Sequence, residues 1–292
     1  MKAKFYFTII LTTLFTVAAI TSCDKSIDLT EELSPLTPAD EDEDASTWKM
    51  AFMTSVDQVP VPEPASVGSD AYKSELASIK DLQSKLTNQQ RKSIEYWSGG
   101  GVLRWNQIFR ELVARYNLPP APKADGSYPA PDAENPFADP GFPFSNPPYA
   151  ARAYGYVSAA MYDALKAAWH YKYLYNRPAP YVNDSGIQAL TPQTSLPAYP
   201  SEEAVMSGTA AELLKFLFPA ALEEITLRAA EQRNAALWSG KASSSDIAAG
   251  LALGKSVAAL FVARGRGDGM GASIGNKAYW DALALNATSR GD

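Results

Sequence analysis

The chain has 292 residues, of which 46% are hydrophobic and 20% are charged. This is long enough for one sizeable domain with a buried core. The net charge of −6 excludes nucleic acid as the main partner, because phosphate contacts need a basic face. The single cysteine and the single histidine exclude an internal disulfide framework, a cysteine-rich zinc site and any mechanism that needs two histidines from one chain.

The N-terminal residues have the pattern of a secretion signal. Lys2 and Lys4 precede an apolar stretch at 5–20, which is too short to span a membrane comfortably. The stretch is followed by Ile-Thr-Ser-Cys, which resembles a bacterial lipobox. The resemblance implies that residues 1–22 are a lipoprotein signal peptide and that lipid on Cys23 anchors the protein to the bacterial cell envelope, in the outer membrane or facing the periplasm. A plain secretion signal or membrane anchor with an incidental cysteine is the alternative.

Residues 23–71 are polar, acidic and rich in proline. A run of like charges at 40–44 and the prolines at 60–64 predict an extended, flexible tether between the lipid and the domain. The alternative is an acidic tail that binds a partner.

The sequence from residue 72 predicts helices and no alternating strand. Apolar residues recur at helical spacing, and the expected helices are 72–86, 88–97, 103–116, 148–175, 201–217, 220–237 and 246–264. Long irregular stretches separate some of them. We therefore expect an all-α bundle with long loops over 72–264, and a C-terminal extension over 265–292 that could be an incomplete segment. Gly250, Gly254 and Ala258 lie four residues apart, which predicts a close helix contact.

Three segments in chain order carry a resemblance to a known superfamily. They are 169–180, 198–204 and 237–250, and residues 86–108 look like the helical lead-in of its bacterial members. On these segments the chain resembles the vanadium-dependent haloperoxidase and type 2 phosphatidic acid phosphatase superfamily. The resemblance covers 86–264 and implies an all-helical fold.

The resemblance also implies a site for a tetrahedral oxyanion. In the family, one Lys, two Arg, a Ser hydroxyl and backbone N–H groups at a helix start surround phosphate or vanadate. One His attacks phosphorus or ligates vanadium, and a second His protonates the leaving oxygen. In this chain Lys172, Ser201 and Asp246 match motif positions, with Gly240 as backbone support.

Four motif positions carry other residues. The first-motif Arg position holds Ala179, the acid His position holds Glu203, the third-motif Arg position holds Ala236 and the nucleophile position holds Ala242. Arg177 and Arg233 are the nearby residues that could replace the missing arginines. Glu202 and Glu203 also place negative charge at a helix start, which suits the helix dipole but repels an anion.

The sequence therefore predicts a non-catalytic binding or assembly module with an unknown ligand or protein partner. The alternative is an acid-phosphatase-like phosphoesterase, or a haloperoxidase relative, with a site reorganised around Lys172, Ser201, Arg177, Arg233 and Glu203. Vanadate is the cofactor of the haloperoxidase branch, but its ligand His is absent here, so no cofactor and no metal ion are expected.

Some residues near the predicted site have other interpretations. Lys172 is a relic of the oxyanion site or an ion-pair partner for Glu203. Asp246 is most simply a helix N-cap. A hard cation held by Glu202, Glu203 and Asp246 is a third hypothesis for the site. His170 matches neither catalytic position.

Overall fold

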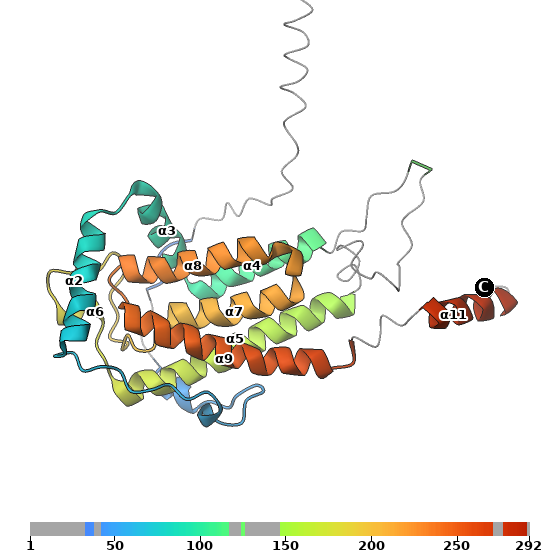
Figure 1. Ribbon diagram of the computed structural model, residues 1–292, viewed down its shortest axis with the longest axis horizontal. Helices are drawn as coiled ribbons and strands as arrows, with labels where there is room; N and C mark the ends of the chain where they lie inside the picture. Colours follow the sequence, from blue (N-terminus) through green and yellow to red (C-terminus); the bar gives the residue numbers. More distant parts are fainter. Residues whose placement is uncertain (1–32, 38–41, 117–123, 126–146, 271–276, 291–292) are drawn as a thin grey trace, which may run out of the picture. The chain divides into compact units, whose positions relative to one another are not determined.

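The structure, a computed structural model, describes residues 33–37, 42–116, 124–125, 147–270 and 277–290 (Figure 1). The expected signal peptide with Cys23, most of the irregular stretch between the predicted helices 103–116 and 148–175, and part of the C-terminal extension lie outside the described residues.

The described residues form helices and no strand, which confirms the all-α prediction. The α-helices are α2 (Asp70–Ser84), α3 (Asn88–Ser98), α4 (Gly101–Tyr116), α5 (Pro147–Tyr175), α6 (Pro180–Asn183), α7 (Glu202–Leu217), α8 (Leu222–Trp238), α9 (Ser244–Gly267) and α11 (Lys277–Arg290). The described residues also contain the short 3₁₀ helices η1 (Glu43–Thr47), η2 (Val56–Gln58) and η4 (Pro219–Ala221).

Helix α7 is the central element of the bundle. It packs against α9, α5, α8 and α4, and Figure 1 shows it between α8 on one side and α5 and α9 on the other. Its residues are small or aliphatic and are buried on nearly every side, from Ala204 to Ala211 and again at Leu213 and Leu214. A helix that is apolar all round belongs in a core.

The tightest packing is between α7 and α9. A Cβ atom added at Gly250 would lie less than 3.0 Å from the Ser201 carbonyl oxygen, and one added at Gly254 would lie equally close to the Val205 carbonyl oxygen. These contacts confirm the close approach predicted from the glycine spacing. By length and a mean hydropathy of 1.6, α9 could also cross a membrane. Its packing against α7, α5 and α8 shows that its apolar residues serve the core.

Helix starts follow the capping rules, with one correction. Thr87 caps α3, and its hydroxyl accepts a hydrogen bond from the Gln90 N–H. Asp246 is not the N-cap of α9. Ser243 is the cap, and Asp246 lies three residues later, where its Oδ2 accepts a hydrogen bond from the Ser243 N–H at 2.6 Å. This reciprocal arrangement is a capping box.

Part of the segment expected to be a tether is instead packed on the domain. We call residues 49–63 the strap. The N–H groups of Ala51, Phe52 and Met53 donate to the buried carboxylate of Asp163 on α5 at 2.6–2.9 Å. Farther along, Tyr175 donates to the Val61 carbonyl at 2.6 Å. Met53, Val59 and Val61 are buried, so over these residues the expectation of a flexible tether was wrong.

Candidate functional site

A cavity of about 360 Å³, which we call the α7 pocket, lies at the N-terminal end of α7. It is lined by residues from the end of α3, the start of α4, one face of α5, the loop at 191–196, the start of α7 and the end of α8. Its apolar lining includes Leu36, Ile94, Trp97, Val102, Leu103, Leu165, Trp169, Leu196 and Met206. The charged side chains in its lining are Glu202, Glu203 and Lys241.

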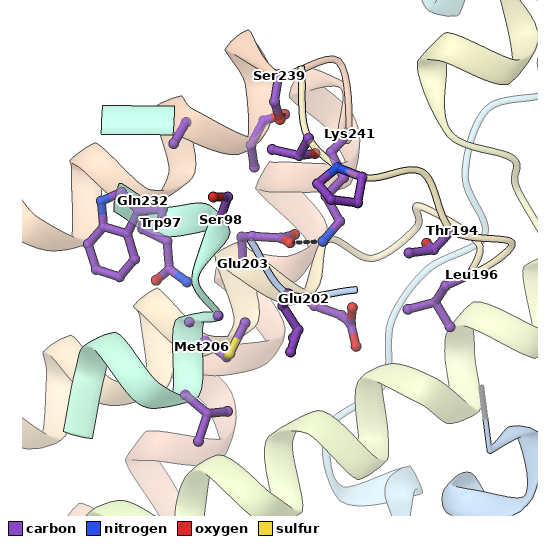
Figure 2. Close-up of a pocket in the computed structure, with 18 of the residues that line it drawn as sticks. Trp97, Ser98, Thr194, Leu196, Glu202, Glu203, Met206, Gln232, Ser239 and Lys241 are labelled. Atoms are coloured by element: carbon purple, nitrogen blue, oxygen red, sulfur yellow. Dashed lines mark hydrogen bonds and ion pairs between the residues drawn. The ribbon is translucent and has the colours of Figure 1, made fainter. Parts of the chain in front are cut away.

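Glu203 and Lys241 form an ion pair in the pocket wall. Lys241 Nζ lies 2.6 Å from Glu203 Oε1, and Figure 2 shows the two side chains directed toward each other. The Ser201 hydroxyl donates to Glu203 Oε2 at 3.2 Å. Burial raises the pKa of Glu203, but Lys241, and Lys172 less strongly, outweigh it and lower that pKa to about 2. The same pairing raises the pKa of Lys241. Glu203 is therefore a fixed negative charge at neutral pH.

Glu202 is held by a different partner. Its Oε1 accepts a hydrogen bond from the indole N–H of Trp169 on α5. Among the residues that the structure describes, none donates to its second oxygen, Oε2. The carboxylate of Glu202 thus lines the pocket beside an aromatic wall without a cationic partner of its own.

Lys172 does not pair with Glu203, although the sequence made that pairing one of its two interpretations. The side chain of Lys172 is buried, and its Nζ donates to the Pro197 carbonyl. It lines a small void that also touches Glu202, Glu203 and Lys241. Burial lowers the pKa of Lys172, against the opposing effect of the two glutamates.

Arg177 and Asp246 form a second, fully buried ion pair. Arg177 Nη2 and Nε both donate to Asp246 Oδ1, the latter at 3.1 Å, and Nη2 also donates to Ser245 at 2.8 Å. The guanidinium lies between the rings of Tyr72 and Tyr199, 4.9 and 4.6 Å from their centroids. Burial raises the pKa of Asp246, against the opposing effect of Arg177. Arg177 is thus engaged with Asp246 and does not line the α7 pocket.

The other motif positions are apolar or distant. Ala236 lines the pocket, whereas Ala242 is buried outside its lining. Gly240 adopts φ +76°, which favours glycine and turns the chain so that Lys241 follows it into the pocket wall. Arg233 donates to the Ser207 hydroxyl at 3.3 Å and does not line the pocket.

Three residues of the pocket lining carry a buried polar atom without a partner among the described residues: Trp97 at Nε1, Thr191 at its hydroxyl and Gln232 at Nε2. Gln232 is only 1% exposed, and its Oε1 accepts from the Trp105 indole at 2.6 Å. Its Nε2 has no partner among the described residues, and the same holds for the hydroxyl of Thr191. Buried polar atoms are usually satisfied, so these three atoms mark a place for a ligand or water.

The structure does not assemble the hypothetical cation site. Asp246 is paired with Arg177, away from Glu202 and Glu203, and the described part of the chain contains no cluster of three or more metal-ligating side chains. His170 lies against the ring of Tyr171 and is not part of the pocket lining.

The sequence missed two residues of this site, Lys241 and Gln232. Lys241 directly follows Gly240 within the third motif, so its position was a usable signal. Nothing in the sequence singles out Gln232, because its role depends on contacts with Trp105 and Gly101 from a helix more than a hundred residues earlier.

Comparison with solved structures identifies the fold. A structure described as the first bacterial vanadium-dependent iodoperoxidase matches with a TM-score of 0.57 and 19% sequence identity, covering 80% of this chain and 60% of its own. An apo-type bacterial vanadium-dependent chloroperoxidase matches with a TM-score of 0.57 and 12% identity, covering 82% of this chain and 64% of its own. This chain therefore spans less than two thirds of the length of either structure.

Comparisons with protein-family models and with curated protein sequences give no match. The structural likeness stands on its own, and at this level of identity it concerns the fold. The chain has the all-helical fold of the vanadium-dependent haloperoxidases, as the motifs predicted.

Proposed function

We propose that this domain is a non-catalytic ligand-binding relative of the vanadium haloperoxidases and phosphatidic acid phosphatases. In this proposal the α7 pocket binds a small molecule, and the protein is held in the bacterial cell envelope by lipid on Cys23. The observation that carries the proposal is the ion pair between Glu203 and Lys241.

The Glu203 carboxylate takes the place of an external anion. It receives a charge-assisted contact from Lys241 at 2.6 Å and a hydrogen bond from Ser201 at 3.2 Å, and Lys172 stabilises its negative charge. A lysine and this serine are the kinds of group that the family uses to hold phosphate or vanadate. A second anion in the same place would meet the charge of Glu203 at close range.

The remaining cations near the site are also engaged. Lys172 is bound to the Pro197 carbonyl, Arg177 to Asp246, and Arg233 to Ser207. Vanadate therefore does not fit the side chains that line the α7 pocket, because the lysine there is already paired with Glu203. Arg177 Nη1 is a buried donor without a partner among the described residues, but Arg177 does not line this pocket.

The reacting groups of the family are replaced by groups that cannot take over their roles. Ala242 has no nucleophile, and the lowered pKa of Glu203 keeps it ionised at neutral pH, so it has no proton to give. A pocket with an apolar lining and a few directed polar groups remains, which is typical of small-molecule sites.

Thermal melts of the purified protein with millimolar orthovanadate or phosphate test this proposal. We expect no shift in Tm, since a ligand that does not bind the native state does not stabilise it. Assays for p-nitrophenyl phosphate hydrolysis and for peroxide-dependent bromide oxidation should show no turnover. Stabilisation that disappears in Lys172→Ala and Ser201→Ala, or turnover lost in the same variants, would overturn the proposal.

The variant Glu203→Gln gives the sharper experiment. It removes the internal negative charge and frees Lys241 while it keeps the size of the side chain, so we expect orthovanadate or phosphate to raise its Tm where neither affects the wild type. Glu212→Gln, on the same helix but paired with Lys215 outside the pocket, is the matched control and should not respond. A Glu203→Gln protein that stays indifferent to both anions would contradict the role given to this carboxylate.

A further inference from the structure

We infer that the α7 pocket takes a small organic cation: a primary amine with an apolar body and an oxygen acceptor at its far end. This inference rests on the proposed function, because it assigns a ligand class to the same pocket. The inferred ligand is a cation, whereas the resemblance implies an anion at this place in the fold.

The first argument is charge. Of the charged side chains that line the pocket, Glu203 and Lys241 neutralise each other across 2.6 Å. Glu202 is then left with a negative charge that no lining cation balances. The Trp169 indole fixes its Oε1, so the carboxylate is already oriented, and Oε2 receives no hydrogen bond from a described residue. A carboxylate held in this way is a suitable partner for an ammonium group.

The nearby cations outside the lining form no ion pair with Glu202 in the described part of the chain. Lys172 lines the small void that also touches Glu202 and Glu203, but its Nζ donates to the Pro197 carbonyl. Arg177 is compensated by Asp246. An incoming cation therefore meets an unbalanced carboxylate, whereas an incoming anion meets two carboxylates and a lysine that is already paired.

The second argument is the wall of the pocket. The lining is mainly aliphatic and aromatic, with Trp97, Trp169, Leu165 and Met206 from three different helices. Figure 2 shows Met206 and Glu203 on the same side of this space, with Thr194 and Leu196 across from them. Such a wall favours an apolar body over a polyol or a free inorganic ion.

The third argument is the set of unpartnered donors in the lining, which are Gln232 Nε2, the Thr191 hydroxyl and Trp97 Nε1. Because Gln232 gives its Oε1 to Trp105, its Nε2 is the atom left to bind a ligand. A Cβ atom at Gly101 would lie 2.5 Å from this nitrogen and 2.6 Å from the Met206 methyl carbon, so the amide packs against the bare backbone of Gly101. The Thr191 hydroxyl is the second donor. A carbonyl or hydroxyl oxygen on the ligand would satisfy any one of them.

A matched set of four compounds tests the inference by calorimetry and thermal shift on the intact protein. Tyramine carries the amine, the ring and the hydroxyl. Phenethylamine lacks the hydroxyl, 4-ethylphenol lacks the amine, and 3-(4-hydroxyphenyl)propionate replaces the cation by an anion. We expect tyramine to bind with a Kd at least about tenfold below that of the propionate, the size of one charge-assisted hydrogen bond, and also below those of phenethylamine and 4-ethylphenol.

The variant Glu202→Gln should reduce the preference for tyramine over the propionate to near unity, because it removes the charge but keeps an oxygen for Trp169. Glu212→Gln should leave the preference unchanged. Equal or tighter binding of the propionate, survival of the preference in Glu202→Gln, or no binding of any of the four compounds would overturn the inference. None of these results would indicate a working oxyanion site. Only stabilisation by vanadate, or enzymatic turnover, would indicate one. Failure of this inference can therefore be distinguished from failure of the proposed function.

Discussion

Individual side chains decide the character of this site. The sequence correctly placed Ser201 at a helix start and Glu203 in the first turn of the same helix. It did not identify Lys241 as the partner of Glu203, because that contact depends on the turn at Gly240, where φ is +76°. Spacing along a helix can be read from a sequence, whereas the direction in which the chain leaves a turn requires the folded backbone.

The same ion pair predicts how stability depends on pH. The pKa of Glu203 falls from an ordinary 4.5 to about 2 in the folded protein. A carboxyl group with a lowered folded pKa stabilises the native state above its unfolded pKa and loses that contribution as the pH falls through the folded value. We therefore expect the Glu203 contribution to fade between about pH 4.5 and about pH 2.

Comparison of wild type with Glu203→Gln isolates this contribution, because the burial of Asp246 affects both proteins alike. Urea unfolding at a series of pH values should show the stability difference between the two proteins shrinking on acidification. A difference that stays constant down to about pH 2 would show that the carboxylate is not held in its charged form.

At the scale of elements, helical periodicity was a reliable guide, and the main differences lie at the ends. Helix α4 begins at Gly101, two residues before the predicted start, because Gly99 already caps α3 and Gly100 turns the chain with φ +102°. The predicted close contact of α9 is present, because glycines four residues apart lie on one face of a helix and allow another backbone to approach that face. The partner of that face, α7, could not be read from the spacing.

The glycine contact gives a prediction for the stability of the bundle. A Cβ atom at Gly254 would lie 3.0 Å from the Thr209 nitrogen and even closer to the Val205 carbonyl, all of it rigid helix backbone. Gly254→Ala should therefore destabilise the protein by about 1–3 kcal/mol, the usual range for overpacking a core.

Gly155 provides the opposite control. It lies within α5, and a Cβ atom added there would meet nothing within 4 Å, so Gly155→Ala should stabilise by about 0.5–1 kcal/mol through helix propensity alone. Chemical unfolding of both variants measures the two effects. A Gly254→Ala variant with unchanged stability would mean that α9 can move away from α7 without a loss in the free energy of unfolding.

At the scale of the molecule, the strap is the largest departure from what the sequence predicted. Its proline and acidic content is typical of a flexible linker, yet its backbone is bound by Asp163 and Tyr175, which lie more than a hundred residues later. Composition describes the intrinsic preference of a segment and carries no information about distant acceptors. For this reason the bundle was predictable and the packing of the strap on it was not.

The predicted membrane anchor also concerns the whole chain. If Cys23 carries lipid, expression in a bacterial host should place the full-length protein in the membrane fraction, and Cys23→Ser should move most of it to the soluble fraction. Metabolic labelling with a palmitate analogue measures the modification directly. An unlabelled wild-type protein, or a Cys23→Ser protein that stays with the membrane, would contradict the anchor.

The hydrogen bond between Trp105 and Gln232 has one more consequence, which concerns ligand orientation. An indole can only donate, so it fixes the amide of Gln232 with its oxygen toward Trp105 and leaves its NH₂ group as the free end. An ammonium group beside that NH₂ group would face a second donor, whereas an ammonium group beside Glu202 would face an acceptor. The inferred amine would therefore be oriented with its nitrogen toward Glu202, so that the pocket would distinguish the head of such a molecule from its tail.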